Sequence, residues 1–253
     1  MLMHLLLLPA LNDGWIGEYG TPKLMDGHPS VRMVAEKIVA RVHAEHAEVE
    51  CRFWFKNEGP ATTVRMGFPD SDSDPPIEGE PVKSIYDRFE SFVDGKRVAT
   101  ELLPKRGMAE YSGIFQTKTV RFGSHQERLV TNRYRVRLGT LAIDGPPPSP
   151  PQPAIRVFNY IFSTGASWKG KIGRTELLVT FMKDADLPPG PVRLVDYPGD
   201  QPYAYWRQRR DVVATSTKGF RAAGRRLYLL RENWSPKGEA HDVWISFGAY
   251  LRK

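Results

Sequence analysis

Residues 48–70 read EVECRFWFKNEGPATTVRMGFPD, and this stretch decides the fold class. Apolar residues occupy every second position in both halves, and successive side chains of a β-strand point to opposite faces of a sheet. The apolar positions are Val49, Cys51, Phe53, Phe55, Val64, Met66 and Phe68. Residues 57–60, NEGP, supply a turn, because Gly allows positive φ and Pro fixes its own φ. The stretch therefore predicts two paired strands, each with one buried and one largely wet face.

The composition is that of a globular chain rich in sheet. The hydrophobic fraction is 41% and the charged fraction 26%, close to globular averages. The 22 glycines and 21 prolines recur between the apolar alternations, as turns do in an all-β sandwich. At 253 residues the chain is long enough for one large or two ordinary domains, and we favour two.

A proline-rich stretch divides the chain. Residues 144–153, DGPPPSPPQP, cannot join a sheet ladder and predict a linker or a surface insertion. We therefore predict one β-sandwich domain over residues 12–143 and a second over residues 154–253, both immunoglobulin-like, mainly antiparallel and with little helix.

The expected strands follow the apolar alternation. They lie near residues 31–42, 49–56, 62–68, 84–93, 97–103, 114–122, 129–138, 155–162, 175–182, 192–196, 212–216, 226–230 and 242–247. Asp94 and Gly95 predict a type I′ hairpin turn, which needs positive φ at both central positions. Residues 203–210, YAYWRQRR, predict a short helix or a basic loop.

Residues 1–11, MLMHLLLLPAL, look like part of a secretory leader. They lack Lys or Arg before the apolar run, and Leu11 is a poor residue before a cleavage point, so the leader is incomplete. The apolar run is far too short to span a bilayer. We expect an exported protein, periplasmic or extracellular; a disordered or core-packed N-terminus is the alternative.

The net charge of +7 is compatible with acidic partners, and also with simple solubility. Three groups of arginines stand out: Arg133, Arg135 and Arg137; Arg207, Arg209 and Arg210; and Arg221, Arg225 and Arg226. The first group alternates along one strand and so projects from one face. Such groups predict a solvated arginine ladder or, if they converge, a site for phosphates or carboxylates of an acidic glycan or lipid headgroup. No nucleic-acid-binding motif accompanies them.

Several motifs together are similar to a family of bacterial exported proteins known as domain of unknown function 4424. They are Asn12-Asp13-Gly14, Met33 with Glu36, Phe55 with Asn57, Gly67-Phe68-Pro69, Tyr160, Thr164-Gly165, Trp168, Gly170, Ile172-Gly173, Asn233-Trp234 and Pro236. The resemblance implies an envelope or secreted β-sandwich protein without an established activity, and it brings no catalytic residues. The incomplete leader and the proline-rich stretch depart from the family pattern.

The glycine-rich loop around Trp168 admits two interpretations. The indole either closes over the sheet end and donates its N–H to a backbone carbonyl, or forms an exposed platform flanked by Lys169 and Lys171, as a sugar- or anion-binding loop would.

The sequence predicts no metal, cofactor or catalytic site. His43, Glu45 and His46 form an H-x-E-H pattern in a short hairpin loop, where the two rings need not converge and a third ligand is not identifiable. Asp70, Asp72 and Asp74 resemble the start of a calcium loop, but Pro75 and Pro76 replace the required Gly, so an acidic solvated loop is expected. Cys51, the single cysteine, is expected in the core. Neither a nucleophile elbow nor a phosphate-cradling glycine loop is present.

We therefore predict a non-enzymatic, exported, all-β protein that acts as a binding, adhesion or assembly module of the cell envelope. Its expected partner is another envelope protein or an acidic glycan, bound through Trp168, Lys169, Lys171 and the first two arginine groups. The alternatives are a carbohydrate-active hydrolase, whose carboxylates meet only in three dimensions, and a binder of anionic glycans or lipid headgroups through the arginine groups.

Overall fold

The computed structural model describes residues 20–26, 30–70, 82–103, 114–141, 155–196, 211–238 and 241–248. In these ranges the chain is almost entirely β, as the sequence predicts. The strands are β1 (Lys23–Asp26), β2 (Val31–Val42), β3 (His46–Asn57), β4 (Thr62–Pro69), β5 (Tyr86–Val93), β6 (Lys96–Val98), β7 (Glu101–Leu103), β8 (Phe115–Phe122), β9 (Glu127–Arg137), β10 (Gly139–Leu141), β11 (Ile155–Tyr160), β12 (Ile172–Phe181), β13 (Arg193–Asp196), β14 (Val212–Thr215), β15 (Arg221–Ala223), β16 (Arg226–Trp234) and β17 (Val243–Phe247). A single 3₁₀ turn, η1 (Ser163–Ser167), interrupts them in the described part of the chain.

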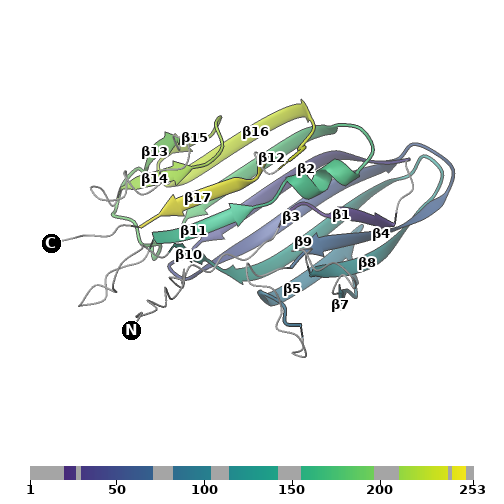
Figure 1. The fold of residues 1–253 in the computed structure, drawn as a ribbon, viewed down its shortest axis with the longest axis horizontal. Helices are drawn as coiled ribbons and strands as arrows, with labels where there is room; N and C mark the ends of the chain where they lie inside the picture. The colour runs from purple at the N-terminus through teal and green to yellow at the C-terminus, as the bar shows by residue number, and fades with distance from the viewer. Residues whose placement is uncertain are drawn as a thin grey trace, which may run out of the picture.

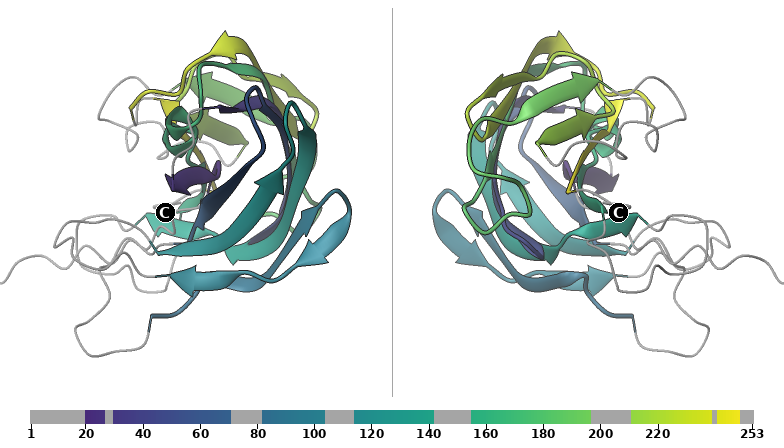
Figure 2. Two further views of the ribbon diagram at one scale, coloured as in Figure 1. Left: turned by 90° about the vertical axis from the view of Figure 1, so that its right-hand side faces the viewer. Right: turned by 90° about the vertical axis from the view of Figure 1, so that its left-hand side faces the viewer.

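Three sheets form the sandwich (Figure 1). An 8-stranded sheet has the order β15-β16-β12-β2-β3-β9-β5-β6. A 4-stranded sheet, β1-β4-β8-β7, and a 5-stranded sheet, β10-β11-β17-β14-β13, cover one of its faces. Phe68 of β4 contacts Tyr134 of β9 at 5.4 Å between ring centroids, and Phe247 of β17 contacts Phe181 of β12 at 5.1 Å. Figure 2 shows the sheets curving around one interior.

The apolar alternation of residues 48–70 faces this interior, but the two strands do not pair. Phe53 is fully buried, and its ring lies 6.3 Å from that of Phe68 across the core. β3 pairs with β2 and β9, whereas β4 pairs with β1 and β8. The expectation of a hairpin was therefore wrong, because the turn carries the chain from one layer to the other. The side-chain amide of Asn57 holds this crossing by donating to the carbonyls of Pro60 and Gly123 at 2.6 and 2.9 Å.

The two halves predicted as separate domains share the 8-stranded sheet. β12, which follows the proline-rich stretch, pairs in parallel with β2, from Arg174 opposite Ala35 to Phe181 opposite Val42. A single cluster of buried apolar side chains also takes residues from both halves. The proline-rich stretch itself lies outside the described residues.

Most predicted strands are present. Asp94 and Gly95 have φ of 49° and 79°, which confirms the predicted hairpin between β5 and β6. Strands β1, β10 and β15 were not predicted. Residues 1–11 and 203–210 lie outside the described ranges. Within those ranges, no helix is long and apolar enough to cross a lipid bilayer.

Candidate functional site

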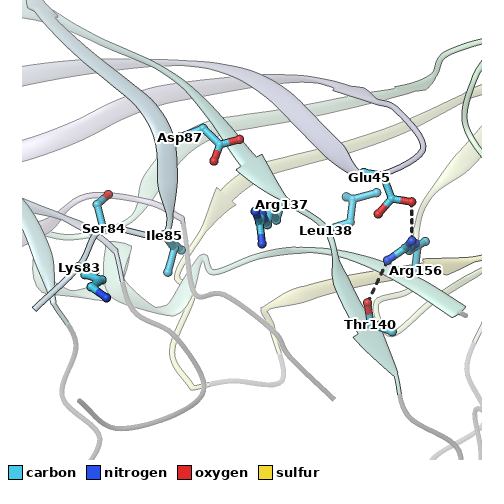
Figure 3. A pocket seen from close by; sticks show the side chains of 9 residues that line it. All are labelled: Glu45, Lys83, Ser84, Ile85, Asp87, Arg137, Leu138, Thr140 and Arg156. Atoms are coloured by element: carbon cyan, nitrogen blue, oxygen red, sulfur yellow. Dashed lines mark hydrogen bonds and ion pairs between the residues drawn. The ribbon is translucent and has the colours of Figure 1, made fainter. Parts of the chain in front are cut away.

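A pocket of about 800 Å³ lies where the β2–β3 turn meets β9, β10, β11 and the start of β5 (Figure 3). Its walls combine charged, hydroxyl and apolar side chains. The lining residues are Glu45, Lys83, Ser84, Ile85, Asp87, Arg137, Leu138, Thr140 and Arg156. They come from segments that the sheets bring together from distant parts of the sequence.

The guanidinium of Arg156 forms part of one wall of the pocket and is fixed by two hydrogen bonds. Arg156 donates to Glu45 Oε1 at 2.5 Å and to Thr140 Oγ1 at 3.1 Å, and Figure 3 shows both bonds. Its positive charge is therefore largely neutralised by Glu45, which is itself exposed. This pairing fixes the turn to β11 but leaves the guanidinium little capacity for a ligand.

The opposite wall is anchored to the core through a buried carboxyl group. Asp70 is fully buried and accepts hydrogen bonds from Ser84 Oγ at 2.8 Å, Ile85 N at 2.8 Å and Gln116 Nε2 at 2.7 Å. Burial raises the pKa of Asp70 to about 6, although these donors oppose the shift. Ser84 and Ile85 are thereby held at the pocket.

Two exposed cations of the pocket have no ion-pair partner in the part of the chain that the structure describes. Lys83 and Arg137 are exposed, and neither forms an ion pair with another described residue. Asp87, the remaining carboxylate of the lining, faces Arg135 at 3.6 Å. Ile85 is partly buried and Leu138 is 3% exposed, so the apolar surface beside the cations comes mainly from Ile85. The pocket is suited to an organic anion with both a carboxylate or phosphate and an apolar part.

The predicted arginine ladder on β9 is present, but its members differ in their partners. Arg133 Nε donates to Glu50 Oε2 at 2.7 Å, and its guanidinium lies 5.3 Å from the centroid of the Phe92 ring. Arg135 is opposed by Asp87. Only Arg137 of the three lines the pocket. The ladder is thus neutralised along part of its length, as a solvated structural face would be.

The interpretation of Trp168 as an exposed platform was wrong. Trp168 is 4% exposed, its Nε1 donates to the carbonyl oxygen of Pro22 at 2.6 Å, and its ring contacts that of Phe55 at 4.5 Å. The structural alternative, an indole closed over the sheet end, is what the structure shows. Lys169 pairs with Glu58 at 2.9 Å, and Lys171 is exposed.

The third arginine group does not line the pocket. Arg207, Arg209 and Arg210 lie outside the described residues. Arg225 donates to the carbonyl oxygens of Met182 and Pro188, both at 2.7 Å, and so holds the chain that follows β12.

One buried carboxyl group, that of Glu36, is surrounded by residues that are distant from one another in the sequence. Glu36 is 1% exposed and accepts hydrogen bonds from Thr21 at 2.9 Å and Thr175 at 2.8 Å. Trp234 Nε1 donates to the same Thr175 hydroxyl at 2.8 Å. Burial raises the pKa of Glu36 to about 7. These residues join segments at opposite ends of the chain, which is a structural role.

A carboxylate pair of the kind that a glycosidase uses is not present among the described residues with raised carboxyl pKa values. Glu36 and Asp70 are each enclosed by their own donors, and neither hydrogen-bonds with another carboxyl group. The hydrolase alternative gains no support from them.

One cluster in the described part of the chain offers metal-ligand chemistry. It consists of His43, His46 and Glu48. Glu45, the carboxylate of the predicted H-x-E-H pattern, is directed to Arg156 instead. Of the predicted calcium loop only Asp70 is described, and its oxygens are occupied by protein donors.

The sequence did not indicate Lys83, Arg156 or Thr140 as neighbours of Arg137. Each is an ordinary polar residue in its own segment, and the pairing of β10 with β11 and of β5 with β9 brings them together. A polar residue at a strand end is the signal they share, and it is too common to select a site.

The comparisons with known proteins bear on the fold. A scan against protein-family models found no match, and a search of curated proteins found none. Among solved structures, the chain is similar to a "putative nutrient binding protein" from Legionella pneumophila, with a TM-score of 0.63 and 18% sequence identity over 93% of this chain and 71% of that one. An M1 zinc metallopeptidase from Deinococcus radiodurans also matches, with 9% identity over 87% of this chain and 43% of that one. Its TM-score of 0.41 is too low to support an argument.

Proposed function

We propose that this protein is a non-enzymatic binding module of the bacterial cell envelope, and that its pocket binds a small organic anion. The observation that carries the proposal is that Lys83 and Arg137, two exposed cations without an ion-pair partner among the described residues, lie in one pocket with the apolar lining residues Ile85 and Leu138. A guanidinium binds a carboxylate or phosphate through two parallel hydrogen bonds, and burial of the apolar part adds affinity. The name of the Legionella pneumophila protein is in keeping with a binding role.

The proposal that the protein is exported is supported by features of the sequence. The leader-like residues 1–11 and the resemblance to domain of unknown function 4424 both support export to the periplasm or the medium. N-terminal sequencing of the protein from the native host tests this. Protein found only in the cytosol, with Met1 intact, would contradict it.

The binding proposal is tested by calorimetric titration with matched ligands. The panel contains short monocarboxylates, dicarboxylates and phosphate monoesters, each beside its neutral amide or alcohol. We expect the anions to bind and their neutral counterparts to bind at least tenfold more weakly. Added salt should weaken the binding, because both cations are exposed.

Charge-removing variants locate the ligand. Arg137→Gln and Lys83→Gln should each weaken anion binding, whereas Arg221→Gln and Lys96→Gln, which remove exposed cations elsewhere, should leave it unchanged. Equal binding of the neutral ligands, or equal loss in all four variants, would refute the proposal.

An acidic glycan bound along the β9 arginines is the second candidate. Glu50 and Asp87 already oppose Arg133 and Arg135, so the observations favour it less. Retention on heparin that falls with salt, and that Arg133→Gln abolishes while Arg137→Gln does not, would favour the glycan over the small anion.

A further inference from the structure

The turn between β2 and β3 places two imidazoles side by side. His43 N donates to His46 O at 2.8 Å, so the turn has only residues 44 and 45 at its tip and the two histidines lie directly opposite each other. Their rings are stacked, with centroids 4.5 Å apart and planes 6° from parallel. Both rings are partly exposed. The rings therefore do converge, in contrast to the expectation from the sequence.

Two carboxylates complete the cluster. Glu48 lies two residues after His46 on the same face of β3, and the possible ligand atoms of His43, His46 and Glu48 are within 4.8 Å of one another. Asp184, in the connection after β12, lies with Oδ2 and Oδ1 at 3.0 and 3.1 Å from His43 Nδ1. A carboxylate that holds one ring nitrogen orients the other toward a metal, as at many zinc sites.

We propose that this hairpin binds one divalent transition metal of the zinc class through His43, His46 and Glu48, with Asp184 orienting the His43 ring. Two imidazole nitrogens and one carboxylate oxygen form a ligand set that zinc accepts, with water in the fourth position. Bonds of about 2.0–2.2 Å in a tetrahedron place ligand atoms about 3.4 Å apart. The side chains reach this spacing by rotating out of their stack, which their exposure allows.

The positive charge of Arg135 disfavours metal binding at this cluster, and this gives a prediction specific to the proposal. Its Nη2 lies 3.5 Å from His46 Nδ1, and its Nε lies 3.6 Å from Asp87 Oδ2. A bound dication repels this guanidinium, and Asp87 gives it a place to which it can withdraw. Removing the charge should therefore strengthen metal binding, which is the opposite of the effect expected from removing a ligand.

The test is a calorimetric titration of the untagged protein with zinc chloride. We expect one zinc ion per chain at this site. The His43→Asn and His46→Gln variants should each weaken binding tenfold or more, and the Glu48→Gln and Asp184→Asn variants about tenfold. Arg135→Gln should bind zinc several-fold more tightly than the wild type. Excess magnesium should not displace zinc, because magnesium prefers oxygen ligands.

A histidine elsewhere provides the matched control. His125 lies in the β8–β9 turn with φ of 55°, a conformation that Asn also adopts, so His125→Asn should leave zinc binding unchanged. Circular dichroism and urea unfolding without zinc establish that every variant folds. The proposal is overturned if the wild type binds no zinc, or if the double variant His43→Asn/His46→Gln binds it as the wild type does. Because His43, His46 and Glu48 do not line the anion pocket, anion binding can fail while zinc binding holds, and the reverse.

Discussion

Replacing Lys118 by Met is expected to stabilise the fold by about 3 kcal/mol near pH 7. Lys118 points from β8 into the core and is 7% exposed. Its Nζ donates to Asn132 Oδ1 at 3.1 Å, and no described carboxylate forms an ion pair with it. Burial lowers the pKa of Lys118 from 10.5 to about 7. A shift of this size corresponds to about 5 kcal/mol, part of which the lost hydrogen bond to Asn132 offsets.

The sign of the pH dependence follows from proton binding. Between pH 7 and 10.5 the unfolded chain holds the Lys118 proton and the folded chain does not, so the free energy of unfolding rises with pH across this window. The slope is about 1.4 kcal/mol per pH unit, the value for one proton. Below pH 7 both states hold the proton, and the folded state carries the full cost of a buried charge. Met fills a similar volume without that charge.

Urea unfolding from pH 6 to pH 10 measures this effect. The advantage of Lys118→Met over the wild type should be largest at pH 6 to 7 and should shrink toward pH 10. Lys96→Met, which replaces an exposed lysine at the start of β6, should follow the wild type at every pH. Parallel profiles for Lys118→Met and the wild type would refute the argument that the ammonium is desolvated in the core.

Three further substitutions test the core. Phe53→Ala should lower the free energy of unfolding by about 3–5 kcal/mol, since Phe53 is fully buried; an unchanged urea midpoint would contradict its placement. Glu36→Gln should stabilise the protein above pH 7 and have little effect below pH 4.5. The raised pKa of Glu36 means that the wild type loses stability as the pH rises from 4.5 to 7, and the variant does not. A difference in unfolding free energy that is constant with pH would contradict this. Trp168→Phe should cost about 1–3 kcal/mol in urea unfolding by leaving the Pro22 carbonyl without its donor, and no loss would show that the hydrogen bond does not stabilise the fold.

Period-two hydrophobicity was enough to predict the strands but not their neighbours. The alternation through Phe53 and Phe68 correctly identified which side chains are buried. It carried no information on pairing, because an apolar face packs equally well in a hairpin or across two layers. Short strands such as β1 and β15 were not predicted because their side chains are partly or fully exposed and so show no apolar alternation.

The sheet order explains why the domain organisation was difficult to anticipate. The parallel pairing of β2 with β12 joins strands that lie on either side of the proline-rich stretch in the sequence, and parallel neighbours always need a long connection. Buried Glu36 opposite Thr175 marks this junction, since a carboxyl group in a core requires donors from whatever strand lies beside it. A buried polar residue in an otherwise apolar face was thus the available signal for a long-range contact.

The two candidate sites depend on pairings that no local pattern encodes. His43 and His46 meet because the turn is tight, which the sequence suggested, but Asp184 reaches them only because β12 ends beside β2. Arg137 reaches the pocket because β9 ends beside the start of β3, directly after the β2–β3 turn, since His46 pairs with Arg137 in register. The two sites are therefore neighbours at the same end of the sandwich, since directly paired residues point to the same face of a sheet. A shift of β9 by one residue against β3 would exchange Arg137 with a core position and remove the anion pocket, so its chemistry depends on the register of the central sheet.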